Sequence, residues 1–282
     1  STTSDFEPEA RARHHSTSSS LLFASYDKRE VNIIDTPGHP EFVGSALAAL
    51  SAVETAVLVV GATTGIELNT RRLFHAAGEA GLARMIVINK IDLAPQLLEA
   101  RVAELKEAFG ARLHCINLPT KGGTDVIDCF DSESGSSDFG SVAEIHREMM
   151  ESTVEIDDAE LEKYLSGKKL DLAELRRTFI KAMTQGHLVP ILFTNAKQGV
   201  GIEDLLHVLA EEAPSPLLTK PRRLRRGAEL IELPCDPERP FLAQVFKVAN
   251  DPHLGSLAML RVLQGKMDGS TLFVAGDDAK PR

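Results

Sequence analysis

The stretch that decides the fold is Val31-Asn-Ile-Ile-Asp-Thr-Pro-Gly-His39. It begins with a short apolar run that predicts a β-strand, and Asp35 follows directly. In an open α/β sheet such a strand delivers Asp35 to the carboxyl edge, where ligands bind. An Asp there can hold Mg²⁺ through a water molecule, and Gly38 lets a backbone N–H approach a phosphate that a Cβ would obstruct. His39 would then lie beside the line of attack on that phosphate. Taken alone, the pattern also fits a tight turn with a capping Asp.

A second motif, Asn89-Lys-Ile-Asp92, ends another buried apolar run at residues 85–88. The carboxylate of Asp92 can accept hydrogen bonds from the N1–H and N2–H₂ groups of guanine, a donor pair that adenine lacks. A site built around such groups rejects the wrong base because its own polar atoms would stay unpaired. We expect Asn89 to tie neighbouring loops together and the Lys90 stem to lie along the base plane. The competing interpretation is a helix N-terminus capped by Asp92.

A third motif, Thr194-Asn-Ala-Lys197, follows the apolar run at residues 189–193. A backbone N–H at Asn195 or Ala196 is in a position to meet guanine O6. Each motif alone occurs by chance, but three of them in this order, each directly after a predicted strand, indicate a site for GTP and GDP.

Strand and helix patterns alternate along most of the chain. Apolar runs predict strands at residues 21–25, 31–34, 55–60, 85–88 and 189–193, and helical patterns fall at residues 42–51, 68–80, 95–109 and 202–212. This alternation predicts an α/β fold with a mostly parallel sheet and helices on both faces. The first twenty residues are polar and rich in Ser and Thr, and they predict a loop.

The alternation stops near residue 113, which predicts an organisation in several parts. We expect an α/β domain at residues 1–113 and 188–213, interrupted by an inserted α+β subdomain at residues 114–187. In the insertion, residues 121–140 are rich in Gly, Ser and Asp, and a helix begins after Asp171 and stops at Gly186. A Pro-rich basic linker at residues 214–239 and the start of a β-barrel at residues 240–282 complete the prediction, with strands at residues 241–248 and 257–262.

Composition limits the class of protein. Hydrophobic residues make up 43% and charged residues 26% of the 282 residues, the mix of a folded protein with a real core. The net charge of −10 argues against non-specific coating of nucleic acid, because phosphate binding depends on Lys and Arg. No apolar run approaches the roughly 20 residues that cross a bilayer, no export signal is evident, and the three cysteines lack metal-type spacing. We therefore expect a cytoplasmic monomer that binds neither membrane nor DNA.

Several stretches resemble a known family. They are IIDTPGHPEFV (33–43), AVLVVGATTGIELNTRR (56–72), VINKID (87–92) and PSP (214–216). They are similar to the GTPase domain of elongation factor G, a translational GTPase, and nearest to the elongation factor G-like branch with altered switch sequences. The resemblance runs from residue 4 to residue 282 and includes INLP (116–119) in the insertion and PFLAQVFKV (240–248) in the barrel.

The resemblance implies a P-loop-NTPase-type GTPase that binds GTP with Mg²⁺ and hydrolyses it on the ribosome, in contact with ribosomal RNA and proteins, during translocation or recycling. Carried over to this chain, Asp35 is the carboxylate on the Mg²⁺ side and Gly38 the amide at the γ-phosphate. His39 orients the attacking water. Asn89, Lys90 and Asp92 read guanine, and Asn195 and Ala196 occupy the positions of the family's Ser-Ala.

The chain departs from the family in the phosphate loop. No Gly-x-x-x-x-Gly-Lys-Ser/Thr sequence occurs in these 282 residues, although phosphoryl transfer needs such a cradle of backbone N–H groups. In the family this loop, a first strand and a first helix lie upstream of the region that matches residue 1. We therefore expect a chain truncated at its N-terminus and within the barrel, which is inactive alone.

A second departure lies in the first switch loop. The family's Arg-Gly-Ile-Thr is replaced by Arg13-His-His-Ser16. The Mg²⁺-ligating Thr of the family maps to Ser16, or with a shift of one residue to Thr17, and either hydroxyl could be a ligand. For the pair His14 and His15, exposed loop residues are preferred over a metal site.

Three functional hypotheses and two charged stretches stay open. The first hypothesis is a fragment of a ribosome-stimulated GTPase; the second is a non-hydrolysing GTP-binding regulator or scaffold; the third is a ribosomal protection factor with the same domain order. Residues 220–226, five of them basic, read as a solvated linker or an RNA contact. The acidic residues 144–162 read as a solvated face or a docking surface for a basic ribosomal protein.

Overall fold

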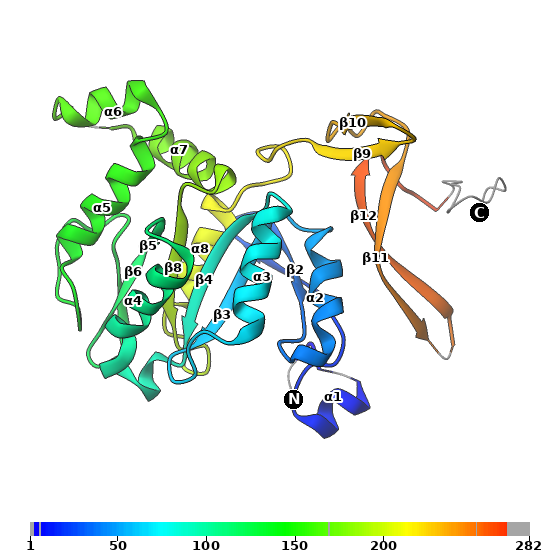
Figure 1. The fold of residues 1–282 in the computed structure, drawn as a ribbon, viewed down its shortest axis with the longest axis horizontal. Coiled ribbons are helices and arrows are strands. Elements are labelled where there is room, and N and C mark those ends of the chain that lie inside the picture. The colour runs from blue at the N-terminus through cyan, green and yellow to red at the C-terminus, as the bar shows by residue number, and fades with distance from the viewer. Residues whose placement is uncertain (1–2, 6, 169, 252, 270–282) are drawn as a thin grey trace. The chain divides into compact units, whose positions relative to one another are not determined.

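The computed structural model describes residues 3–5, 7–168, 170–251 and 253–269 (Figure 1). The chain divides into two compact units, Ser1–Leu218 and Thr219–Arg282. In the described part of the first unit the helices are α1 (Pro8–Arg13), α2 (Val43–Leu50), α3 (Leu68–Glu79), α4 (Leu98–Phe109), α5 (Val142–Val154), α6 (Asp158–Leu165), α7 (Leu172–Gln185) and α8 (Ile202–His207). Short 3₁₀ turns are η1 (Pro40–Phe42), η2 (Ile91–Leu93) and η3 (Pro95–Leu97), and η4 (Val208–Glu212) is a π-helix.

A parallel sheet forms the centre of the first unit and confirms the predicted α/β fold class. Its strands are β3 (Thr55–Gly61), β4 (Ala83–Asn89), β8 (Val189–Thr194) and β5 (Leu113–Cys115), in the order β3-β4-β8-β5. The central strands β4 and β8 are continuous apolar runs because they are buried on both faces, whereas β3 at one edge of the sheet exposes Val57 and Val59.

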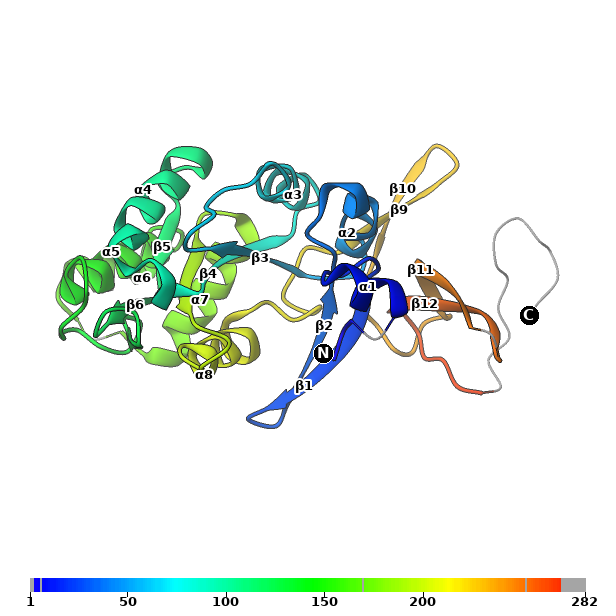
Figure 2. The ribbon, with the colours of Figure 1, turned by 90° about the horizontal axis from the view of Figure 1, so that it is seen from below.

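The two faces of this sheet have separate hydrophobic cores, because successive side chains of a strand point to opposite sides. On one face Ile86 and Ile88 pack with Phe74 of α3 and with residues of α4. On the other face Met85 and Leu192 pack with Phe179 and Met183 of α7 and Met149 of α5. Figure 2 shows α3 and α4 on one side of the sheet and α8 on the other.

A separate antiparallel hairpin carries the stretch that ends in Asp35. Strands β1 (Ser20–Tyr26) and β2 (Arg29–Asp35) pair so that Ser20 faces Asp35. The two residues between them, Asp27 and Lys28, both have positive φ values of 44° and 65°, which is the conformation of a tight two-residue hairpin turn.

The prediction of a loop for the first twenty residues is wrong in part, because α1 lies within them. Pro8 occupies the first turn, where its missing N–H costs nothing, and Glu9 pairs with Arg13 one turn later at 3.0 Å. His14 ends the helix with a left-handed φ of 57°. The apolar periodicity that marks longer helices is absent from so short an element.

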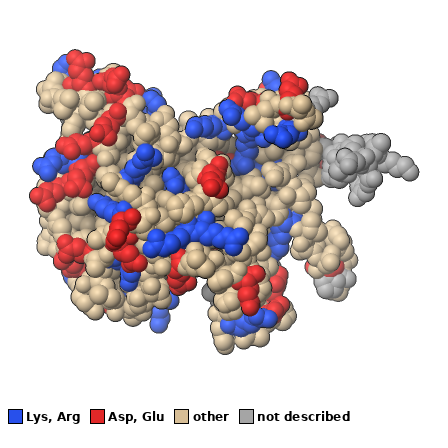
Figure 3. All heavy atoms as spheres, viewed as in Figure 1, with Lys and Arg blue, Asp and Glu red and all other residues tan. Residues whose placement is uncertain are grey.

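The segment at residues 114–187 contains the three helices α5, α6 and α7 and a hairpin. Strands β6 (Asn117–Thr120) and β7 (Asp125–Asp128) pair around a turn in which Gly122 and Gly123 have φ values of 71° and 76°. No strand was predicted among the Gly-, Ser- and Asp-rich residues 121–140, yet β7 lies within them. The side chain of Asp171 accepts a hydrogen bond from Ala173 N, and Gly186 ends α7 with a φ of 74°, as predicted. Acidic side chains gather over α5 and α6 (Figure 3).

The second unit consists of two hairpins in its described part. Strands β9 (Arg222–Arg226) and β10 (Glu229–Leu233) pair with each other, as do β11 (Leu242–Asp251) and β12 (Gly255–Gln264). The first hairpin lies where an unstructured basic linker was expected. Arg223 of β9 forms an ion pair at 3.0 Å with Glu232, its partner on β10. Opposite charges on facing strands therefore stabilise a hairpin whose first strand lies within the basic residues 220–226. No helix in the described residues is long and apolar enough to cross a membrane.

Candidate nucleotide-binding site

The carboxyl ends of the central strands bring two of the predicted motifs to one edge of the sheet. Asn89 is opposite Gly61 on one side and Thr194 on the other in the strand register. The loops that begin at Lys90 and at Asn195 therefore leave the sheet side by side. This is the edge at which open α/β sheets bind ligands.

Asn89 joins these two loops through its side-chain oxygen. Its Oδ1 accepts hydrogen bonds from Lys90 N at 2.8 Å, Ala196 N at 3.0 Å and Thr194 Oγ1 at 3.2 Å. Lys90 adopts the left-handed conformation, with φ 63° and ψ 42°. A single amide oxygen thus fixes the geometry of the 89–92 loop relative to the 194–197 loop.

Asp92 lies in the short turn η2 and is partly buried, while Lys90 is exposed. The turn of the β6–β7 hairpin packs against this loop at Gly123. A Cβ on Gly123 would stand 2.7 Å from Ile91 O, and its φ is 76°. In the sequence this turn is marked only by the pair Gly122-Gly123, which does not reveal that Gly123 packs against the 89–92 loop.

The loop after β8 is closed by its own backbone. Asn195 N donates to Val200 O at 2.9 Å, and Val200 N donates to Asn195 O at 3.2 Å. The Asn195 side chain is 2% exposed, and its Nδ2 has no hydrogen-bond partner within the described residues. Ala196 is exposed, with its N–H held by Asn89.

Asp35 and Gly38 lie at the end of β2 and in the loop after it. Gly38 O accepts a hydrogen bond of 2.8 Å from Nδ2 of Asn69, a residue of α3 that is 7% exposed. A Cβ on Gly38 would meet no atom of the described residues within 4 Å. The packing of the chain itself therefore does not require glycine at this position. Sequence reasoning missed Asn69, whose contact joins residues 31 positions apart.

His39 caps the turn η1 and belongs to a cluster of three rings. Its Nδ1 accepts a hydrogen bond from Glu41 N at 3.4 Å, which leaves the proton of a neutral ring on Nε2. The ring stacks on His15 with centroids 5.3 Å apart and planes at 9°, and Phe42 lies 6.1 Å away. His14 does not share this contact, since it ends α1.

The two hydroxyls near the predicted metal position, those of Ser16 and Thr17, differ in their hydrogen bonding. Ser16 Oγ donates to Asp5 Oδ1 at 2.7 Å. The hydroxyl of Thr17 is buried and has no hydrogen-bond partner in the part of the chain that is described. Asp35 pairs through its backbone with Ser20. No group of three or more His, Cys, Asp or Glu residues suited to a metal occurs among the described residues.

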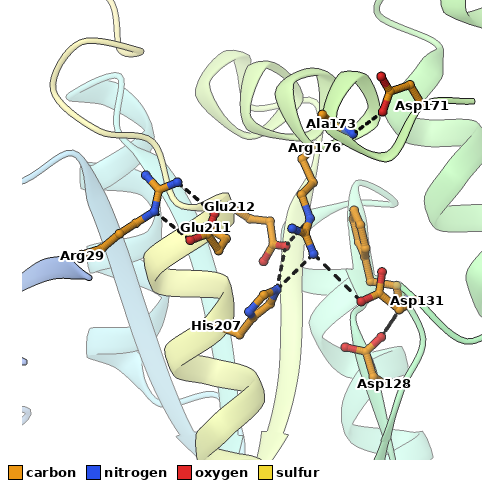
Figure 4. Close-up of polar contacts among 10 residues, drawn as sticks. Arg29, Asp128, Asp131, Asp171, Ala173, Arg176, His207, Glu211 and Glu212 are labelled. Carbon is orange, nitrogen blue, oxygen red and sulfur yellow. Dashed lines mark hydrogen bonds and ion pairs between the residues drawn. The ribbon is translucent and has the colours of Figure 1, made fainter. Parts of the chain in front are cut away.

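A polar network around the buried residue Glu212, outside the predicted motifs, links three parts of the first unit (Figure 4). Glu212 of η4, with a side chain 3% exposed, lies 3.5 Å from Arg176 Nε and 3.6 Å from His207 Nε2. Burial raises the pKa of Glu212 to about 7, although Arg176 opposes the shift. The preceding residue, Glu211, pairs with Arg29 of β2 at 2.7 and 3.0 Å.

A second polar side chain, Asn117 of β6, joins the strand β8 to the helix α8. It is fully buried; its Oδ1 accepts from Phe193 N at 2.7 Å, and its Nδ2 donates to Asp204 Oδ2 at 2.8 Å. Burial also raises the pKa of the Cys115 and Cys129 thiols to about 12, so both stay neutral and unreactive.

Comparison with known proteins gives one consistent set of similarities. Residues 1–215 match the family model described as the elongation factor Tu GTP binding domain. Similar curated proteins include elongation factor G of Thermotoga petrophila, 31% identical over 96% of this chain, and elongation factor G of Ureaplasma parvum, 27% identical over 99%. An elongation factor G-like protein of Mycobacterium tuberculosis is 28% identical over 98%.

A crystal structure of a protein from Thermus thermophilus is similar to 96% of this chain, with a TM-score of 0.79 and 28% identity. The chain covers 41% of that structure, and 42%, 44% and 41% of the Thermotoga, Ureaplasma and Mycobacterium relatives. It therefore spans less than half of the length of each protein that it resembles here.

Proposed function

The chain belongs to the family of elongation factor Tu-type GTP-binding domains, in its elongation factor G-like group, and from this premise we propose that it is part of a GTPase of the ribosome. The complete polypeptide would bind GTP and hydrolyse it to GDP and phosphate on the ribosome, during translocation or recycling.

The observation that carries this proposal is the set of three hydrogen bonds to Asn89. They hold the loop with Asp92 beside the loop with Ala196 before any base is bound. A preorganised pair of loops lets the Asp92 carboxylate take the donors of guanine while a backbone N–H faces O6. The described geometry supports guanine recognition at this edge of the sheet.

At the phosphate end we propose that Gly38 supplies a backbone N–H and that His39 orients the attacking water. Two observations support the first role. Packing and backbone conformation leave room for a Cβ at Gly38, and Asn69 holds the Gly38 carbonyl, so close approach of a ligand is the remaining reason for glycine. For His39, the supporting observation is that Nδ1 accepts the bond from Glu41 N. The ring proton is then on Nε2, which can donate to a substrate water.

The donor set fits a magnesium ion. Mg²⁺ prefers carboxylate, hydroxyl and water oxygens, and Asp35 and Ser16 or Thr17 carry such groups. The ion would neutralise negative charge that develops on the phosphates. Ser16 is already bonded to Asp5, whereas the Thr17 hydroxyl is an orphaned buried oxygen among the described residues. Of the two hydroxyls, that of Thr17 has the greater need of a partner.

We propose that the phosphate loop comes from polypeptide outside these 282 residues. The described part of the sheet supports this: β2 pairs with β1 and β3 with β4, but β2 and β3 form no pair with each other. Without the loop, this chain should bind GTP very weakly and should not hydrolyse it. A titration of fluorescent GDP that gives micromolar affinity for the 282-residue chain would contradict this expectation.

The decisive experiment uses the longer protein that includes the phosphate loop, in a GTP hydrolysis assay with and without ribosomes. We expect turnover that ribosomes stimulate and that His39→Ala removes. Absence of stimulated turnover, with GTP bound tightly, would instead favour a non-hydrolysing regulator. The observation that favours this second candidate is the altered first switch, in which Ser16 is tied to Asp5.

A further inference from the structure

The contact that the proposed function leaves unexplained is the stack between His15 and His39. The two imidazoles are nearly parallel, at 9°, with centroids 5.3 Å apart. Phe42 is the third ring of the cluster: its centroid lies 6.0 Å from that of His15 and 6.1 Å from that of His39. The three rings come from two segments: His15 follows α1, His39 directly precedes η1, and Phe42 is the last residue of η1.

The local sequence explains how His15 reaches this place. The left-handed residue His14 reverses the chain after α1. Serines at every second position then tie the returning segment to the start of the chain. Their hydroxyls donate at 2.7 to 2.9 Å, from Ser16 to Asp5, from Ser18 to Glu7 and from Ser20 to Ser4 O.

His15 takes no part in those ties. Its Nδ1 lies 3.1 Å from Ser16 O, so that it donates when it carries the ring proton. This bond fixes the orientation of the half-buried His15 ring, which then covers one face of His39. The His39 side chain is 47% exposed, and its other polar contacts are with Glu41: the long bond from Glu41 N at 3.4 Å and the Glu41 carboxylate at 3.9 Å from Nδ1.

We infer that His15 is a positioning residue, which holds the imidazole of His39 by ring stacking in the orientation needed to align the attacking water. This inference rests on the proposed function and adds a residue to it. An exposed imidazole rotates freely about χ1 and χ2, and catalysis requires one orientation. A stacked neighbour with its own fixed ring removes most of that freedom at the site where a water must be held.

The contact can be tested on the 282-residue chain by NMR of the histidine ring signals. We expect a nuclear Overhauser effect between the rings of His15 and His39, and a ring-current shift of the His39 signals. His15→Ala should remove that shift, His15→Phe should keep a ring-current shift, and the matched control His14→Asn should leave the signals in place, since Asn tolerates the left-handed conformation. His39 signals that do not respond to His15→Ala refute the contact.

The role can be tested in the longer protein with ribosomes. We expect His15→Ala to lower kcat about threefold to tenfold, the loss expected from removing one aromatic pair, with no change in the Kd for GTP. His15→Phe should restore most of the rate, and His14→Asn should match the wild type. His15→Ala should cause no further loss in a His39→Ala background, because His15 acts through His39.

The outcomes separate the two proposals. An unchanged kcat in His15→Ala, or losses that add in the double variant, refutes the role of His15 and leaves the proposed GTPase intact. A wild-type protein without ribosome-stimulated turnover refutes the proposed function and the role of His15 together.

Discussion

Glu212 should make the first unit less stable as the pH rises. In the folded chain its pKa is about 7, against an ordinary value of 4.5, because the side chain is buried. Below about pH 4.5 the carboxyl is neutral in both the folded and the unfolded chain, and burial carries no charge penalty. Between pH 4.5 and 7 the folded chain holds a proton that the unfolded chain has lost, so stability decreases as pH rises.

The magnitude follows from the difference between the two pKa values. Each pH unit between them contributes about 1.4 kcal/mol, so the total loss is about 3 kcal/mol and is complete above pH 7. Glu212→Gln keeps an oxygen that can accept from Arg176, which lies 3.5 Å away, but it carries no charge at any pH. The stability of the wild type relative to Glu212→Gln should therefore fall by about 3 kcal/mol over this range.

The assay is urea unfolding followed by circular dichroism at 222 nm, at several pH values between 5 and 8. This signal reports the first unit because every helix of the described residues lies within Ser1–Leu218. Glu211→Gln is the matched control for loss of one negative charge, since Glu211 pairs with Arg29 instead. Both comparisons are repeated with His207→Gln, because His207 Nε2 lies 3.6 Å from the same carboxylate. Parallel curves for the wild type and Glu212→Gln would refute the reasoning.

Three other changes test the site and its supports. Asn89→Ala removes the acceptor of three hydrogen bonds, so it should lower the free energy of unfolding by about 2 kcal/mol and speed amide hydrogen exchange at Ala196. Asn89→Asp keeps an acceptor and is the control. Equal exchange in both variants would argue that Asn89 does not hold the two loops together. Asn117→Ala leaves the buried Phe193 N–H without a hydrogen-bond acceptor, so the free energy of unfolding in urea should fall by about 3 kcal/mol. A fall below about 1 kcal/mol would show that another group replaces the amide. Asp92→Asn in the longer protein should shift nucleotide preference from guanine to xanthine in competition binding, and unchanged guanine selectivity would remove Asp92 from base reading.

The central sheet could be predicted because its signals are local. Strands β3, β4 and β8 are continuous apolar runs, and the helices between them carry their own periodicity, whereas the short edge strand β5 contains His114 and was not predicted. The positions of Asn89 and Thr194 at one edge then follow from strand direction alone. Their hydrogen bonds through Oδ1 are the local consequence of that register.

The remaining contacts depend on residues far apart in the sequence. Glu212 reads as a surface residue at the end of an amphipathic helix, yet Arg176 from α7 covers it. Asn69 and Gly123 contact predicted loops from separate elements. The strand β7 was hidden by a composition typical of loops, because its pairing with β6 depends on a turn with positive φ values. Periodicity and propensity contain no information about such partners.

The helix α7 gives the segment at residues 114–187 a part in the main fold. Phe179 and Met183 of α7 form one core with Met85 and Leu192 of the central sheet. A protein engineer could not excise this segment as a detachable module, because the sheet would lose the cover of one face. In chimeras with related proteins, the segment and the strand residues beneath it would have to be exchanged together.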